Sequence, residues 1–296
     1  TAPHNYGEND FPLIIQDKQF QLDTMTNPPT ATSVVSPTSS ATATYATVNG
    51  VVGANLHVAP EMMRFRILNA SSITSYHIAL STTLNNPTSF ANMHMIATGG
   101  GYLDAPKTVT EALLAAGDLK EFMVDFSLYP DGDTLYVIDL SVPADFDSPN
   151  TVGKALMAFV VEDALFPSDP IVSLPSTLNT SYGLAPGTVA KERTKSIDFS
   201  NNEYLIDGTA MDTATINDSI LVNSKERWTI TNNSAISIPF AISKGSFQVV
   251  SYNGKVGVGN TVVSHTNFGT MPTELLGYKN VQLLRPAASM VIEMRF

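Results

Sequence analysis

The sequence predicts an all-β protein made of two sandwich domains, and three observations support this. Only 15% of the 296 residues are charged, while 43% are hydrophobic, and Gly and Pro contribute 18 residues each. Many short runs alternate between apolar and polar residues with period two, as half-buried strands do. A chain of this length can bury two separate hydrophobic cores.

The expected strands of the first domain follow one another along the first half of the chain. They are a buried strand at 11–17, half-buried strands at 63–69 and 75–80, and further strands at 121–126, 134–138 and 155–161. A stretch from Thr24 to Thr47 is rich in Pro, Ser, Thr and Ala and carries almost no charge. We expect this stretch to be a long surface loop.

A segment punctuated by prolines separates the two domains. The strand pattern resumes beyond it, at 196–199, 227–231, 246–252, 280–284 and 289–296. We therefore expect a first domain at 1–166, a linker at 167–186 and a second domain at 187–296.

Two short glycine motifs predict turns rather than ligand sites. The acidic motif at 131–133 lacks the flanking acids of a calcium loop, so a tight hairpin turn is expected there. The three glycines at 99–101 are followed by no lysine at the spacing of a phosphate-binding loop. We expect a turn there as well.

Composition limits the classes of partner and of site. The net charge is −11 and Lys and Arg form no cluster, so nucleic acids and anionic membranes are poor partners. No stretch approaches the roughly 18 apolar residues of a membrane-spanning helix. Cysteine is absent, which excludes disulfides, thiolate zinc sites, cysteine nucleophiles and blue copper. No signal-peptide pattern is visible at the N-terminus, which leaves both a trimmed exported protein and a cytoplasmic one open.

Several longer motifs occur in a characteristic order. They are FPLIIQDK at 11–18, VAP at 58–60, RFRILNAS at 64–71, GGGYL at 99–103, VTEALLAAGD at 109–118, GYKNV at 277–281 and VIEMRF at 291–296. In this order they resemble the second and third cupredoxin domains of multicopper oxidases of the laccase, bilirubin oxidase and spore-coat type. The resemblance spans nearly the whole chain and implies two cupredoxin-like Greek-key β-sandwiches.

The same resemblance implies that the copper ligands are missing. The run 227–243 is similar to the family segment in which a tryptophan strand leads into a His-Pro-Phe-His-Ile-His motif, and Ile238, Ala241 and Ser243 stand where its histidines would be. The chain has five histidines but no His-x-His pair, so no copper cofactor is expected and this chain alone is predicted to be inactive. Either a lineage that abandoned copper or deliberate replacement would produce this pattern.

One weaker motif could bind a soft metal. Met93, His94 and Met95 follow one another, and thioethers select copper(I). On a strand, however, Met93 and Met95 share one face while His94 points to the other, which favours methionine as core filler. We expect His77 to be a hydrogen-bonded or exposed strand histidine.

Three functional hypotheses remain open. The first is a copper-free structural or protein-binding module, since the family includes copper-free periplasmic members that serve in assembly, for example in cell division. This hypothesis implies a periplasmic or extracellular location. The second is part of a copper-dependent oxidoreductase whose copper-binding segments are absent from this chain. The third is a small-molecule binding module that uses the stretch from Thr24 to Thr47 as a lid.

The resemblance also predicts an open strand edge in the second domain. In the family, a further strand follows the one that resembles 291–296 and closes the sandwich. Without it, an apolar groove that includes Ile238, Phe240 and Ile242 would be exposed and would recruit another strand. We expect a protein partner, a second copy or another segment of this chain to fill it, and we expect Trp228 to lie in the core.

Overall fold

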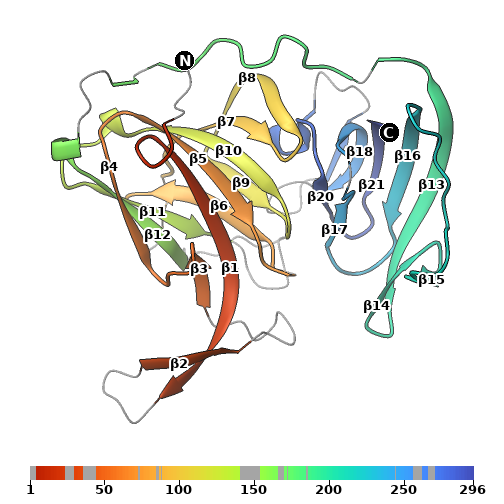
Figure 1. The fold of residues 1–296 in the computed structure, drawn as a ribbon, viewed down its shortest axis with the longest axis horizontal. Coiled ribbons are helices and arrows are strands. Elements are labelled where there is room, and N and C mark those ends of the chain that lie inside the picture. The colour runs from red at the N-terminus through yellow and green to blue at the C-terminus, as the bar shows by residue number, and fades with distance from the viewer. Residues whose placement is uncertain are drawn as a thin grey trace. The chain divides into compact units, whose positions relative to one another are not determined.

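The protein is all-β, as predicted, with a few short 3-10 helices between strands (Figure 1). The computed structural model describes residues 5–23, 30–35, 45–72, 74–84, 87, 89–140, 154–165, 170–171, 173–184, 186–243, 245–255, 262–265 and 271–296. In this described part, no helix has the length and hydrophobicity needed to cross a membrane.

The chain divides into two compact units. Unit 1 comprises Thr1–Ile96 and Pro106–Ser176, and unit 2 comprises Ala97–Ala105 and Thr177–Phe296. The boundary after Ser176 falls inside the segment 167–186 that was expected as a linker. The sequence did not indicate that Ala97–Ala105 would group with the second unit.

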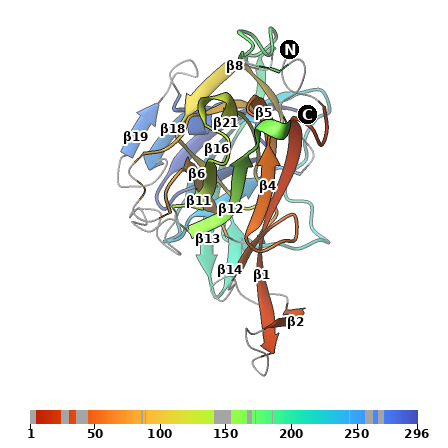
Figure 2. The ribbon, with the colours of Figure 1, turned by 90° about the vertical axis from the view of Figure 1, so that its left-hand side faces the viewer.

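The first sheet of unit 1 is built around a parallel pair of strands. Its strands, in spatial order, are β2 (Thr30–Val35), β1 (Asp10–Asp23), β5 (Met62–Asn69), β10 (Leu119–Asp125), β7 (Met93–Thr98) and β8 (Gly101–Val109), with β3 (Tyr45–Val48) also pairing β1. β1 runs parallel to β5, and β10 runs antiparallel to it. Figures 1 and 2 show β1 continuing past the rest of the sheet to pair with β2.

The second sheet of unit 1 closes the sandwich. Its strands, in spatial order, are β4 (Ala54–Val58), β12 (Lys154–Val161), β11 (Thr134–Asp139), β6 (Tyr76–Ser81) and β9 (Glu111–Leu114). Phe65 of the first sheet contacts Phe159 of the second with ring centroids 4.6 Å apart. The hydrophobic core of unit 1 therefore lies between the two sheets.

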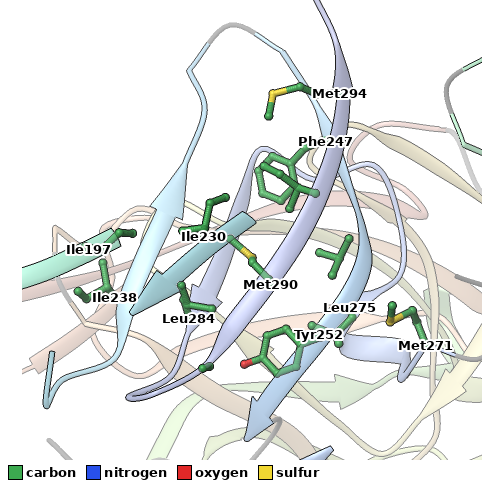
Figure 3. Close-up of a cluster of buried hydrophobic side chains, with 13 residues drawn as sticks. Ile197, Ile230, Ile238, Phe247, Tyr252, Met271, Leu275, Leu284, Met290 and Met294 are labelled. Atoms are coloured by element: carbon green, nitrogen blue, oxygen red, sulfur yellow. The ribbon is translucent and has the colours of Figure 1, made fainter. Parts of the chain in front are cut away.

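Unit 2 has one large sheet and one small sheet. The large one contains, in spatial order, β15 (Thr209–Ala210), β14 (Glu203–Ile206), β13 (Val189–Ser200), β16 (Lys225–Asn232), β21 (Ser289–Arg295), β18 (Phe247–Lys255) and β19 (Val262–His265). The small one pairs β17 (Ile238–Ala241) with β20 (Val281–Leu284). Their apolar side chains form a single core cluster (Figure 3).

The two units repeat one pattern of strand pairing. β13 runs parallel to β16 as β1 does to β5, with Ile15 opposite Asn69 and Ile197 opposite Asn232. β21 pairs antiparallel with β16 as β10 does with β5, and β17 pairs with β20 as β6 does with β9. Among the described strands of unit 2, none corresponds to β11 or β12.

Three local predictions need correction. The stretch from Thr24 to Thr47 contains strand β2 and most of β3, because its Thr and Val residues favour extended backbone. β6 is buried on both faces rather than one: Ala79 belongs to a second apolar cluster that includes Leu84 and Phe90. The motif at 131–133 does form a turn, but it joins strands of different sheets, so it is not a hairpin.

Other local predictions are confirmed. Residues of β5 alternate between buried and half-buried positions along 63–69. Gly99 and Gly100 form the turn between β7 and β8. Sequence periodicity thus located β5 correctly, and the glycine run located this turn.

Candidate functional site

The three positions expected to stand in place of copper ligands lie on β17 and just beyond it. Ile238 begins β17, is 5% exposed and belongs to the apolar core of unit 2 (Figure 3). Ala241 ends the strand, Ser243 lies in the following turn, and both are exposed. None of these side chains can donate an imidazole nitrogen to a metal, so the residues present do not fit a copper ion.

β17 packs against the core through the side chains of one face, and it pairs with β20 through the backbone groups of one edge. Phe240 and Ile242 pack against the core, and the ring of Phe240 meets that of Phe247 edge to face at 5.9 Å. Ile242 N donates to Asn280 O at 2.9 Å, which continues the pairing with β20. Alternate residues of an antiparallel strand bond to opposite edges, so the backbone groups of Pro239 and Ala241 point away from β20.

The Met-His-Met motif lies on β7 as its periodicity predicted. Met93 and Met95 are buried, while His94 is half-buried with its Nδ1 2.9 Å from Thr108 Oγ1. Burial lowers the pKa of His94, although the charge of Asp125 opposes this shift. The imidazole and the two thioethers lie on opposite faces of the strand, so they do not converge on one point.

Two other histidines, His57 and His77, are described with their side chains, and each lies beside a carboxylate. His57 Nδ1 lies 2.9 Å from Glu162 Oε2 on the surface, and buried His77 places Nε2 3.2 Å from Glu111 Oε2. The hydrogen bond from His77 lowers the pKa of Glu111. His4 and the side chain of His265 lie outside the described residues. Across the described residues, no three His, Cys, Asp or Glu side chains are grouped closely enough to hold a metal ion.

A charged network on β13 and β16 surrounds the tryptophan of unit 2. Arg193 Nε lies 2.7 Å from Glu226 Oε2, and its Nη1 lies 2.8 Å from Asp218 Oδ1. Trp228 Nε1 donates to Glu226 Oε2 at 2.8 Å, and the Arg193 guanidinium lies over the indole ring. Hydrogen bonding to Arg193 holds the pKa of the buried Glu226 carboxyl below its usual range.

This network corrects the expectation for Trp228. The indole packs against the core but is only partly buried, because its polar edge reaches Glu226 and one face meets Arg193. Sequence reasoning missed Arg193 and Glu226. The signal available in the sequence was a carboxylate, Glu226, two residues before Trp228 and so on the same face of one strand. Strand alternation alone cannot identify Arg193 as its partner.

Comparison with known proteins finds cell division proteins and multicopper oxidases among the relatives of this chain. No family model matches the chain. The cell division protein FtsP of Xenorhabdus nematophila is 28% identical over 265 residues, which cover 85% of this chain and 50% of that protein. The multicopper oxidase mco of Staphylococcus epidermidis is 26% identical over 298 residues, which cover 99% of this chain and 54% of that protein. The chain therefore spans about half the length of these relatives.

Solved structures show the same fold. The McoA multicopper oxidase of Aquifex aeolicus superimposes with a TM-score of 0.74 and 22% identity, covering 98% of this chain and 60% of that one. The laccase of Pediococcus acidilactici superimposes with a TM-score of 0.73 and 20% identity, covering 100% of this chain and 56% of that one. Both matches extend over the two units together.

Proposed function

Because the chain is related to the multicopper oxidases over nearly its whole length yet lacks their copper ligands, we propose that it is a copper-free structural or protein-binding module. The observation that carries this proposal is the place of Ile238. Its side chain is part of a closed apolar core at a position where relatives of this type would present a ligand. An imidazole there would bury a polar ring among aliphatic side chains, which costs free energy unless it is paired.

The relation to FtsP supports a role in assembly. FtsP proteins of several bacteria are 27 to 29% identical to this chain over about 85% of its length. Their name assigns them to cell division, and the same kind of role is proposed for this chain. A periplasmic or extracellular location is part of the proposal.

A second candidate function is kept because of the other relatives. Proteins named as multicopper oxidases match 99% of this chain, and the chain spans only 54% of their length. In this alternative the chain is the scaffold of a copper-dependent oxidoreductase, and the copper-binding segments come from elsewhere.

Copper binding tests whether this chain is copper-free by itself. The purified chain is incubated with copper(I) and copper(II), dialysed and measured by elemental analysis and an absorption scan. We expect less than about a tenth of an equivalent of copper, because neither a thiolate nor paired imidazoles are available. Stoichiometric copper or an intense blue charge-transfer band would overturn the copper-free proposal.

A gain-of-ligand variant provides the matched control. Replacing Ile238, Ala241 and Ser243 together by His restores the three imidazoles at the family positions. A variant with His at exposed Ala241 and Ser243 alone leaves the core intact. Copper retained by these variants but not by the native chain would show that the assay detects such sites.

A further inference from the structure

The second sheet of unit 1 ends at strand β4, which has a neighbouring strand on one side (Figure 1). Among the described residues, β4 pairs with β12 alone, and the two strands run parallel. Asn55 and His57 of β4 are exposed, whereas Ala54 and Leu56 are half-buried. In the described part of unit 1, β4 is therefore an open sheet edge.

The pairing with β12 identifies the backbone groups of β4 that point outward. Val58 O accepts a hydrogen bond from Glu162 N at 3.0 Å, so the backbone groups of Val58 point toward β12. Backbone groups alternate in direction along a strand, so those of Leu56 point the same way as those of Val58. The N–H and C=O groups of Asn55 and His57 consequently point to the free edge.

β4 lacks the features that keep natural sheet edges from pairing. Such edges usually carry charged residues, proline or bulges. Two other edge strands of these sheets have them: β8 contains Asp104, Pro106 and Lys107, and β9 contains Glu111. β4 contains no Lys, Arg, Asp, Glu or Pro, and its register with β12 is regular.

We propose that β4 pairs with β4 of a second copy of the chain about a two-fold axis. The axis passes beside Leu56, so that Asn55 of each copy lies opposite His57 of the other. In an antiparallel ladder, opposed residues whose backbone groups face each other exchange both hydrogen bonds. Each Asn55–His57 pair does so here, and the second sheets of the two copies become one continuous sheet.

The strand is complementary to itself in this register. Both sides of a two-fold interface come from the same surface, so one sequence must satisfy both. The outward backbone groups of Asn55 and His57 meet their equivalents in the other copy. A shift by one residue would instead oppose outward groups of one copy to inward groups of the other.

The register also keeps like charges apart. His57 Nδ1 lies 2.9 Å from Glu162 Oε2, and both side chains are exposed. Antiparallel pairing places each His57–Glu162 pair beside the uncharged Asn55 of the other copy. Like charges therefore do not meet at the axis, where they would destabilise the pairing.

Two exposed valines at the start of β4 add apolar area to the same interface. Val51 and Val52 are 54% and 48% exposed. In an antiparallel pair, this end of one strand lies next to the Val58 end of the other. The contact is short, so we expect a weak dimer that depends on concentration. This self-association goes beyond the proposed function and does not depend on copper.

Sedimentation velocity and light scattering between about 1 µM and about 1 mM test the pairing, since weak dimers dissociate in this range. We expect the measured mass to rise from that of a monomer toward that of a dimer. Hydrogen exchange at both concentrations locates the contact. The amides of Asn55 and His57 should exchange more slowly at the high concentration, because they are hydrogen-bonded in the dimer.

A matched pair of variants tests the edge itself. Asn55→Pro removes an outward N–H that β12 does not use, and proline is tolerated at a sheet edge. We expect it to weaken the dimer at least about tenfold. Asn55→Ala keeps this N–H and should leave the dissociation constant within about twofold of the native value. Circular dichroism confirms that both variants are folded.

A second pair of variants leaves the strand backbone unaltered. Val52→Glu places a carboxylate near Glu162 of the other copy, so the dimer should weaken. Ile216→Glu adds the same charge at an exposed apolar position of unit 2 and should leave the dimer unchanged. This pair carries the test if Asn55→Pro fails to fold.

Three results would overturn the proposal: a monomer at every concentration, a dimer that Asn55→Pro and Val52→Glu leave as tight as the native one, or a dimer in which the Asn55 and His57 amides exchange as fast as in the monomer. The third would place the interface elsewhere. Copper retention is measured separately, so failure of the dimer test alone would leave the copper-free proposal standing.

Discussion

The side-chain amide of Asn232 donates a hydrogen bond to the carbonyl oxygen of Leu284 at 2.9 Å. The same Nδ2 donates to Ile236 O at 2.8 Å, and Oδ1 accepts from Ser234 N at 2.9 Å. Asn232 ends β16 of the large sheet, while Leu284 ends β20 of the small one. One buried amide therefore ties together the two layers of unit 2.

Unit 1 contains the same arrangement. Asn69 Nδ2 donates to Leu114 O at 3.0 Å and to Thr74 O at 2.8 Å, and Oδ1 accepts from Ser71 N at 3.0 Å. Asn69 ends β5, and Leu114 ends β9 of the opposite sheet. The repeated pattern identifies this asparagine as a structural element of both sandwiches.

Removing either amide should destabilise the unit that contains it. Asn69→Ala and Asn232→Ala each leave buried carbonyl groups without a donor, and we expect a loss of about 2–3 kcal/mol in the free energy of unfolding. Urea titration measures this, with Asn217→Ala, at an exposed position, as the control. A loss of less than about 0.5 kcal/mol, typical of surface substitutions, would contradict the assigned role.

Phe65 and Trp228, which lie at the same spacing before Asn69 and Asn232, should differ in their contribution to stability. Phe65→Ala removes a fully buried ring and should cost about 3–5 kcal/mol. Trp228→Ala removes a ring that is only partly buried, so we expect a smaller loss, about 2–3 kcal/mol. Urea unfolding followed by circular dichroism compares the two. Equal losses would argue that Trp228 is as enclosed as Phe65.

Unit 2 should lose stability in acid through Glu226. Its pKa in the folded protein lies below the ordinary value of 4.5 because of Arg193, so the stabilisation is present above that pH and is lost as the pH falls through the folded pKa. Glu226→Gln should therefore be less stable than the native chain at pH 7 but less sensitive to acid.

The measurement follows Trp228 fluorescence during urea titration between neutral pH and about pH 3, below the ordinary range of a glutamate pKa. Glu203→Gln, at an exposed carboxylate of β14, is the control. An unchanged dependence of the urea midpoint on pH in Glu226→Gln would refute the assignment of this carboxylate.

A glycine in the turn between β7 and β8 should resist substitution. A Cβ at Gly100 would meet Tyr278 O at 2.6 Å and Ser246 Cβ at 2.7 Å, all within unit 2. Gly100→Ala should cost about 1–3 kcal/mol, because backbone must move to relieve the overlap. Gly183→Ala, where a Cβ meets nothing within 4 Å, should be near neutral in thermal unfolding. Similar melting temperatures for the two variants would show that the turn adapts freely.

Local periodicity predicted much of the fold. The alternation along 63–69 located β5 and its buried face, and the glycines at 99–101 located a turn. Periodicity failed at β6. The alternation along 75–80 predicted a half-buried strand, whereas both faces of β6 are buried. Composition also misled the prediction at Thr30–Val35, because it favoured a loop where strand β2 lies.

The sequence by itself determined the all-β class and the resemblance to multicopper oxidases, and it showed that no histidine stands at Ile238, Ala241 and Ser243. These features depend on residue identity and on near neighbours along the chain. Only the tertiary structure decided that Ile238 is core, that Arg193 and Glu226 hold Trp228, and that the rings of Trp228 and Phe296 are in contact. Such contacts join residues distant in sequence, and their geometry follows from strand order and register, which no local pattern specifies.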